Sequence, residues 1–214
     1  MHEFQAWPKT ARLFRDIVIT EKLDGTNAAV HITAVPNDGP GEVTVWPGYW
    51  ASLVVDGTRY VVSAQSRKRI ITPGKTTDNY GFAAWVYDNA EALVRALGEG
   101  VHYGEWWGQG IQRNYGRTSR TFSLFNTARY VDGFPSLENG MELEGGSLDV
   151  VPVLYQGPFS EAVILAELAS LAEHGSVAAP CWPTPEGICV YHTQTRSVFK
   201  VTLDNNDAGK WEVA

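Results

Sequence analysis

The sequence predicts an α+β fold in which antiparallel β-sheets carry the functional residues and helices flank them. Three observations predict it: about ten short segments with strand-like character, turn signals between several of them, and only two stretches with helical spacing. With 214 residues, 44% of them hydrophobic, the chain is long enough to bury a sizeable core. No internal repeat or low-complexity linker divides it, so we expect a single domain over residues 1–214.

The expected strands follow one another along most of the chain. A short apolar run occupies residues 16–20, and residues 27–35 alternate between apolar and polar side chains. Further strands are predicted at residues 42–46, 51–55, 59–64, 101–107, 121–125, 150–155, 188–192 and 198–203. The runs Asn37-Asp38-Gly39 and Asp56-Gly57 are typical of tight turns between strands.

Two segments have helical spacing. After Asp78, a typical N-cap residue, apolar side chains recur at helical intervals over residues 82–97 until Gly98 ends the pattern. The second pattern starts at Ser160 and ends before Gly175. The helices are therefore few and long, and the strands carry most of the chain.

Composition excludes several classes of protein. No stretch approaches the ~20 consecutive apolar residues of a membrane span, so no membrane partner is expected. The N-terminus lacks the apolar run of an export signal, and we predict a cytoplasmic protein. Cys181 and Cys189 are the only cysteines; they lack zinc-site spacing with histidine, so we expect them to be reduced.

The net charge of −7 argues against a nucleic-acid partner, but the distribution of the positive charges argues for one. Residues 57–77 contain five basic residues and no acid, and residues 106–131 contain four and no acid. These two windows, hereafter the basic windows, hold 9 of the 17 Lys and Arg residues. A phosphate-binding face would explain them; the alternative is that their charges pair elsewhere in the fold.

Five short segments together suggest a nucleotide pocket: Glu21-Lys22-Leu23-Asp24-Gly25-Thr26-Asn27, Ser66-Arg67, Gly104-Glu105-Trp106-Trp107-Gly108, Glu186-Gly187-Ile188-Cys189-Val190 and Phe199-Lys200-Val201. Lys22 is the candidate nucleophile. A lysine amine attacks only without its proton, which burial and positive neighbours such as Arg67 and Lys200 would favour if they converge on it. Asp24 would hold the lysine or a hydrated divalent metal, Gly25 would permit a turn, and Asn27 would bond substrate or backbone.

Glu105 and two phenylalanines complete the candidate pocket. Glu105 lies between glycines and tryptophans in an expected buried strand, where a carboxylate needs a bonded partner. A ribose hydroxyl is one candidate partner, and a buried arginine is the alternative. Phe122 and Phe125 are either core residues or a platform on which a purine stacks, and the larger pattern favours Phe125 for stacking.

These segments resemble the nucleotidyltransferase domain of the covalent nucleotidyltransferase superfamily, which comprises RNA ligases, DNA ligases and mRNA capping enzymes. Within it, the chain is most similar to phage-type RNA ligases of the nick-sealing group, from about residue 8 to residue 203. The narrower resemblance rests on Gly104-Glu105-Trp106-Trp107-Gly108-Gln109-Gly110-Ile111-Gln112-Arg113-Asn114 and Phe122-Ser123-Leu124-Phe125. It implies the ATP-grasp-like nucleotidyltransferase fold of the ligases.

The resemblance also implies roles for individual residues. Lys22 is adenylylated, Glu105 binds ribose, Phe125 stacks on adenine, and Lys200 grips the α-phosphate. Asp24 and Glu186 organise Mg²⁺ or Mn²⁺ through water. The further implied contacts are backbone contacts of Glu21 to the base and a contact of Arg67 to the ribose or the nucleic-acid end. Asn27 is a nucleotide-binding candidate from the first motif alone. The basic windows, rather than the resemblance, predict that Arg69, Arg113, Arg117 and Arg120 contact nucleic acid.

Two departures from the family pattern bear on activity. The family closes with Lys-x-Lys, whereas Thr202 stands at the second position here and leaves one lysine for the phosphates. Only 14 residues follow Lys200, so we expect neither an oligonucleotide-binding barrel nor a helical C-terminal domain. A minimal ligase core is the resulting expectation, and a partner protein that supplies the missing domain is an open alternative.

The sequence thus predicts an ATP-dependent RNA ligase that joins a 5′-phosphate to a 3′-hydroxyl through a covalent lysyl-AMP. Two rivals remain open. One is a DNA or DNA/RNA nick ligase, and the other is a nucleotide- or RNA-binding module with weak or no turnover.

Overall fold

The structure, a computed structural model, describes residues 3–7, 9–36, 51–130 and 140–204. The chain forms two compact units. Unit 1 comprises Met1–Lys22 and Pro152–Ala214, and unit 2 comprises Leu23–Val151. Each unit has its own sheet and its own hydrophobic core.

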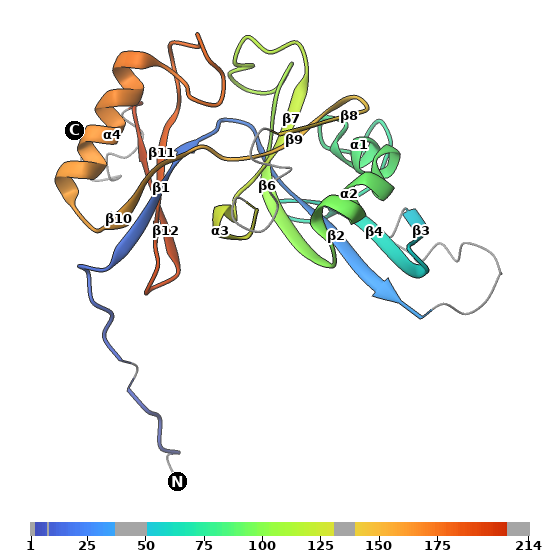
Figure 1. The fold of residues 1–214 in the computed structure, drawn as a ribbon, viewed down its shortest axis with the longest axis horizontal. Coiled ribbons are helices and arrows are strands. Elements are labelled where there is room, and N and C mark those ends of the chain that lie inside the picture. Colours follow the sequence, from blue (N-terminus) through green and yellow to red (C-terminus); the bar gives the residue numbers. More distant parts are fainter. Residues whose placement is uncertain (1–2, 8, 37–50, 131–139, 205–214) are drawn as a thin grey trace. The chain divides into compact units, whose positions relative to one another are not determined.

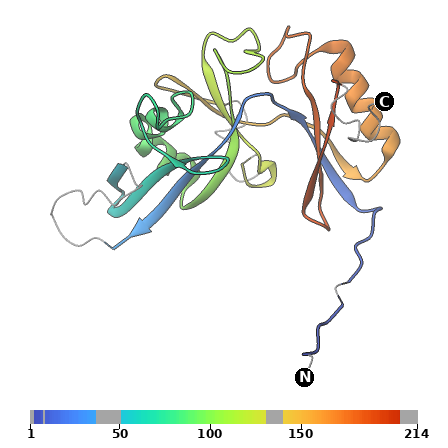
Figure 2. The same cartoon turned by 180° about the vertical axis from the view of Figure 1, so that it is seen from behind.

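Unit 1 is built on a four-stranded antiparallel sheet in the order β10-β1-β11-β12. Its strands are β1 (Asp16–Lys22), β10 (Val153–Pro158), β11 (Gly187–His192) and β12 (Ser197–Thr202). Helix α4 (Glu161–His174) covers one face of this sheet, as the two opposite views show (Figures 1 and 2). Ile17 and Ile19 of β1 pack with Leu171 of α4, so Val18, Thr20 and Lys22, which alternate with them, point away from the helix.

Helix α4 begins and ends where the sequence predicts. The Ser160 hydroxyl accepts a hydrogen bond from the Val163 amide at 3.4 Å, which satisfies one of the unpaired donors of the first turn. Gly175 follows the last residue with φ of 87°, a conformation that suits glycine, and its amide donates to the Leu171 carbonyl.

Unit 2 is built on an eight-stranded sheet in the order β3-β4-β2-β6-β7-β9-β8, with β5 paired to β4. The strands are β2 (Thr26–Val35), β3 (Ala51–Val55), β4 (Thr58–Ser66), β5 (Ile70–Ile71), β6 (Gly100–Gly108), β7 (Arg120–Leu124), β8 (Met141–Leu143) and β9 (Gly146–Val150). All pairs are antiparallel except β7 with β9. The predicted α+β class with antiparallel sheets is therefore confirmed.

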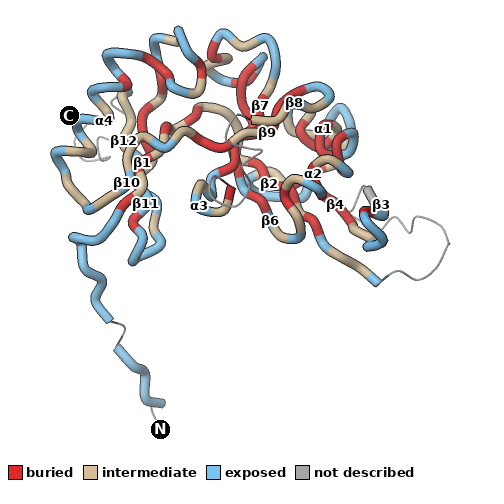
Figure 3. Tube along the Cα trace, in the orientation of Figure 1, coloured by how far each residue is buried: buried red, intermediate tan, exposed pale blue. Residues whose placement is uncertain are grey.

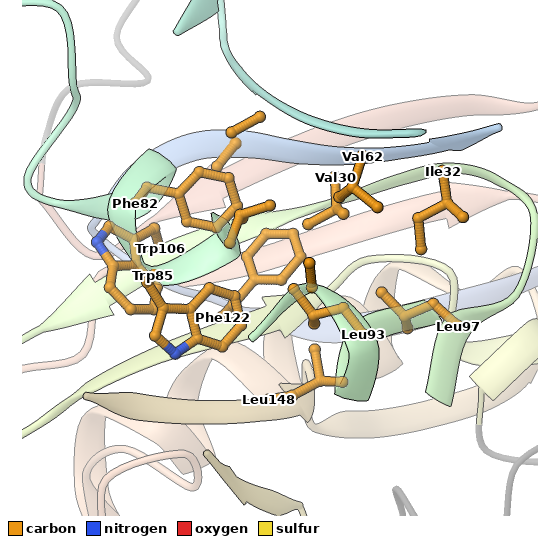
Figure 4. Packing of buried hydrophobic residues seen from close by; sticks show 14 of the residues in the cluster. Val30, Ile32, Val62, Phe82, Trp85, Leu93, Leu97, Trp106, Phe122 and Leu148 are labelled. Atoms are coloured by element: carbon orange, nitrogen blue, oxygen red, sulfur yellow. The ribbon is translucent and has the colours of Figure 1, made fainter. Parts of the chain in front are cut away.

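The core of unit 2 lies between this sheet and two short helices, α1 (Phe82–Asp88) and α2 (Ala90–Leu97). Phe82 and Trp85 of α1 pack against Trp106 of β6 and Phe122 of β7 (Figure 4). The ring centroids of Phe82 and Phe122 are 4.9 Å apart. The burial colouring of the backbone marks buried residues along the strands and helices that this core joins (Figure 3).

The helical pattern over residues 82–97 is two helices, not one. Asn89 lies between them, and its Nδ2 donates to the carbonyls of Trp85 and Glu144 at 2.8 and 3.0 Å. Its Oδ1 accepts from the Glu144 amide at 3.1 Å. A side chain that replaces backbone partners in this way interrupts a helix. Asp78 caps α1 from outside the position directly before the helix. Its carboxylate accepts hydrogen bonds from the amides of Ala83 and Ala84 in the first turn.

The strand predictions are confirmed with small shifts of their bounds. The exception is residues 150–155, where β9 ends and β10 begins, because this segment passes from unit 2 to unit 1. The turn at Asp56-Gly57 is confirmed, with φ of 50° and 82°. The predictions for residues 37–39 and 42–46 lie outside the described residues. Sequence patterns did not predict β5, β8, most of β9 or the one-turn α3 (Thr127–Tyr130).

Among the described helices, none has both the length and the apolar content needed to cross a membrane.

Candidate functional site

Lys22 and Glu186 meet in unit 1. Lys22 is the last residue of β1 and pairs in register with Gly187, the first residue of β11. Glu186 immediately precedes Gly187, and its Oε2 lies 2.5 Å from the Lys22 Nζ. The two side chains are 23% and 17% exposed. The candidate nucleophile is therefore held in a largely buried ion pair with a second predicted site residue.

Lys200 and Thr202 share the face of the sheet that carries Lys22, on the side away from α4. Across the sheet, Lys22 lies opposite Gly187, which lies opposite Thr202. Lys200 is one row further along, opposite Cys189. Because side chains two residues apart on a strand point the same way, Lys200 and Thr202 both project on this face. The position of the missing second lysine is thus in the same row as Lys22.

Glu21 points to the opposite face and is almost completely buried, at 1% exposure. Its carboxylate accepts from the Ser176 hydroxyl at 2.6 Å and from the Val177 and Ala178 amides at 2.9 and 2.8 Å. Burial raises the pKa of Glu21, and these hydrogen bonds counteract part of that rise. The Glu21 side chain therefore anchors the loop at residues 176–178 to the strand that carries Lys22.

In unit 2, three groups hold the backbone and carboxylate of the Asp24-Gly25 turn. The Asp24 amide donates to the Tyr115 hydroxyl at 2.8 Å, and Arg113 Nε donates to Asp24 Oδ2 at 3.0 Å. The Gly25 amide donates to Glu105 Oε1 at 3.2 Å. Glu105 thus has a bonding partner that sequence reasoning did not consider, namely the turn itself.

Gly25 is required for close packing rather than for a left-handed turn. It is not among the residues with positive φ. A Cβ atom at this position would lie 2.5 Å from the Trp106 carbonyl oxygen and 2.7 Å from the Trp107 Cβ. The sequence predicts that Gly25 permits a turn, and the structure adds that the absence of a side chain allows two backbone segments to approach closely there.

Asn27, Glu105 and Phe125 lie on the sheet face opposite the aromatic core. Asn27 is directly opposite Glu105 in the β2–β6 register, and Phe125 follows the last residue of β7, with its amide bonded to the Tyr103 carbonyl. Phe125 is 40% exposed, whereas Phe122 is fully buried in the core. Of the two phenylalanines, only Phe125 presents a surface on which a base could stack.

A positively charged cavity of about 360 Å³ opens in unit 2 beside Thr26, the residue that follows the Asp24-Gly25 turn. Its lining comprises Thr26, Ser66, Arg67, Lys68, Arg69, Ile71, Asp78 and Asn79. Within the described part of the chain, no ion pair engages Arg67, Lys68 or Arg69. Lys68, Thr26 and Asn79 were not predicted; the basic window was the one signal that pointed to Lys68.

The three arginines of the second basic window that were expected to contact nucleic acid all have partners in the protein. Arg113 pairs with Asp24, and the Arg117 guanidinium lies over the Trp107 ring at 5.2 Å from its centroid. Arg120 donates to the carbonyls of Tyr80 and Gln109 at 2.7 and 3.0 Å. These contacts give each arginine a structural role, which the alternative of pairing within the fold had anticipated.

The described residues contain no group of three or more His, Cys, Asp or Glu side chains that could by itself hold a metal ion. A divalent ion at this site would therefore need oxygen ligands from water or a substrate as well as from the protein. Mg²⁺ is commonly bound in that way, through one or two carboxylates, waters and substrate phosphates.

Comparison with protein families gives a match to the RNA ligase family over residues 15–202. The chain belongs to the RNA ligase family. Comparison with curated protein sequences gives no match.

Solved structures of Naegleria gruberi RNA ligase resemble this RNA ligase family member in fold. A point mutant without ligand matches with a TM-score of 0.54 and 17% identity. Point mutants with ATP and Mn and with AMP and Mn match with TM-scores of 0.54 and 0.53 and identities of 16% and 15%. In each case the match covers 87% of this chain and 49% of the other, so the chain spans about half the length of these proteins.

Proposed function

We propose that this RNA ligase family member is an ATP-dependent RNA ligase that works through a covalent adenylate on Lys22. The observation that carries the proposal is the Lys22–Glu186 ion pair, in a chain of this family. It joins a lysine and a glutamate from two separate motifs, both of which the family resemblance had assigned to the reaction. The ATP- and AMP-bound structures of a ligase with the same fold support the choice of nucleotide.

The reaction proceeds in three displacements at phosphorus. The neutral Lys22 amine attacks the α-phosphorus of ATP; an N–P bond forms and the bond to the β-phosphate oxygen breaks, which releases pyrophosphate. A 5′-phosphate oxygen of the RNA then attacks the same phosphorus and frees Lys22. Finally a 3′-hydroxyl attacks the 5′-phosphorus, and AMP leaves.

Several predicted residues are proposed to take part in these steps. Glu186 is in contact with the amine and can accept its proton before attack. Lys200, on the same sheet face as Lys22, is proposed to neutralise the α-phosphate, with Thr202 unable to add a second charge. Asn27, Glu105 and Phe125 are proposed to bind the nucleoside, the phenylalanine by stacking.

The residues present fit a divalent ion. Asp24 in unit 2 and Glu186 in unit 1 each offer carboxylate oxygens, the ligand type that Mg²⁺ and Mn²⁺ prefer. Asp24 would hold such an ion through water, because one of its oxygens already accepts from Arg113. When bound, the ion would shield the phosphate charges and assist the departure of pyrophosphate.

The adduct on Lys22 can be tested by intact-mass measurement after incubation with ATP and Mg²⁺. We expect a mass increase of one AMP that is absent in Lys22→Ala and retained in Lys9→Ala, which removes an exposed lysine outside the motifs. A parallel incubation with GTP tests the nucleotide. No adduct with either nucleotide, and with either Mg²⁺ or Mn²⁺, would contradict the ligase proposal and favour a binding module.

RNA is the proposed substrate, with residues of the first basic window as phosphate contacts. Arg67 and Arg69 are exposed and line the positively charged cavity of unit 2. Sealing of matched nicks in RNA and DNA distinguishes an RNA ligase from the rival DNA ligase. Faster sealing of the DNA nick than of the RNA nick would overturn the assignment of RNA.

A further inference from the structure

The segment at residues 109–117, hereafter the 109–117 loop, has a strained backbone. Gln112, Asn114 and Tyr115 have positive φ angles of 42°, 60° and 50°. Residues other than glycine rarely adopt this conformation, and it persists only where the surrounding structure enforces it. Three such residues within four positions indicate that contacts with the surrounding structure hold the loop in this conformation.

The loop is anchored at several points. Ile111 is fully buried in the core of unit 2, and the Gly110 amide donates to Asn114 Oδ1 at 2.7 Å. Tyr115 is 3% exposed and packs edge-to-face on Trp107, with ring centroids 5.0 Å apart. Arg117 covers the same indole ring. The side chains of Arg113 and Tyr115 therefore arise from a rigid support.

Both of these side chains reach Asp24. The Tyr115 hydroxyl accepts from the Asp24 amide, and Arg113 Nε donates to Oδ2 of the same residue. Among the described residues, Oδ1 has no hydrogen-bond partner. One carboxylate oxygen of Asp24 is thus committed to a guanidinium whose charge opposes an approaching cation, and the other remains available.

We propose that Arg113 and Tyr115 are positioning residues for Asp24, with Arg113 as a counter-ion that weakens metal binding there in exchange for a fixed carboxylate orientation. The inference rests on the proposed function and deepens it. Arg113 would hold Asp24 to single-oxygen contact with a hydrated ion, and Tyr115 would fix the backbone of the turn. This differs from the phosphate contact that the sequence suggested for Arg113.

The decisive measurement is the affinity for Mn²⁺ in the absence of nucleotide. The electron paramagnetic resonance signal of free Mn²⁺ reports how much of the ion is bound. We expect Arg113→Met to bind Mn²⁺ about fivefold more tightly than the unaltered protein, since a partly exposed ion pair is worth up to about 1 kcal/mol. Asp24→Asn should abolish this gain when combined with Arg113→Met. Arg113→Lys keeps the charge and should stay close to the unaltered protein, and Arg95→Met, which removes a surface arginine, should have no effect.

The rate of adduct formation at saturating Mn²⁺ is the second measurement. We expect Arg113→Met and Tyr115→Phe each to slow it by about three- to tenfold, the value of one lost hydrogen bond. Tyr115→Phe keeps the packing on Trp107 and should leave Mn²⁺ affinity unchanged. General destabilisation would not slow adduct formation in both variants while leaving the Mn²⁺ affinity of Tyr115→Phe unchanged and raising that of Arg113→Met.

Unchanged or weaker Mn²⁺ binding by Arg113→Met would overturn the inference, as would a normal rate for Tyr115→Phe. If the unaltered protein forms no adduct, the proposed ligase function fails, yet the Mn²⁺ titrations still decide whether Arg113 opposes metal at Asp24. The two failures are therefore distinguishable.

Discussion

His102, a buried histidine of unit 2, is expected to contribute to the pH dependence of stability. His102 is 1% exposed; its Nε2 bonds to the Gly98 carbonyl at 2.9 Å and its Nδ1 to the Tyr130 hydroxyl at 2.5 Å. A carbonyl only accepts, so Nε2 carries the proton and Nδ1 accepts from tyrosine. Burial lowers the pKa of His102 from 6.5 to about 4, and the nearby charges of Arg129 and His31 act in the same direction.

We predict that His102 contributes stability at neutral pH that is lost as the pH falls from about 6.5 to about 4. In that window the unfolded chain binds a proton that the folded protein does not bind. The loss should reach at most about 3 kcal/mol. Urea denaturation of the unaltered protein and of His102→Gln between pH 7.5 and pH 5 measures it. The difference between them isolates His102 from Glu21 and Asp149, whose pKa values burial raises; a difference that does not change with pH would contradict the prediction.

At the scale of the element, Asn89 determines that residues 82–97 form two helices. Asn89→Ala would leave the Glu144 amide and carbonyl without the partners described above. We expect a loss of about 2 kcal/mol in the free energy of unfolding, because Asn89 is buried and each of its hydrogen bonds contributes about 1 kcal/mol. Asp88→Ala, an exposed neighbour on α1, is the control and should change stability little. Equal effects of the two changes in urea denaturation would argue against this role.

The register of β12 with β11 leads to a prediction about Thr202. Thr202 is in the row of Lys22, so Thr202→Lys would add a second cation on the nucleophile's face of the sheet. We expect a roughly fivefold lower ATP concentration at half-maximal adduct formation, since one further charge contact is worth about 1 kcal/mol. Val198→Lys places the same charge on the same face but four residues away, and it should have a smaller effect. A larger gain from Val198→Lys would contradict the row assignment.

At the scale of the whole molecule, net negative charge coexists with two basic windows. Arg69, which is exposed and without an ion pair in the described part of the chain, is expected to contact a phosphate. Arg69→Ala should weaken RNA binding and reduce the slope of log affinity against log salt by about 0.7 to 0.9. Arg95→Ala, whose partners are Glu91 and Asp56, should leave the slope unchanged. A slope that is equal in Arg69→Ala and the unaltered protein would exclude this contact.

Strand positions were predictable because alternation of side chains reflects burial on one face of a sheet. The same rule placed Lys22 on an extended segment, and β1 ends at that residue. Helical spacing did not predict the break within residues 82–97, because the apolar pattern continues through Asn89. Alternation did not predict β5 and β8, because these strands are too short to show a pattern.

The sequence by itself determined the fold class, the motifs and the family, since each depends on residue types and spacings that are local to a segment. Only the tertiary structure decided which motifs touch. The Lys22–Glu186 pair depends on the register of β1 with β11, and the Asp24–Arg113 pair joins residues 89 positions apart. Such contacts form because separate segments pack and pair in one register, and no local pattern encodes that register.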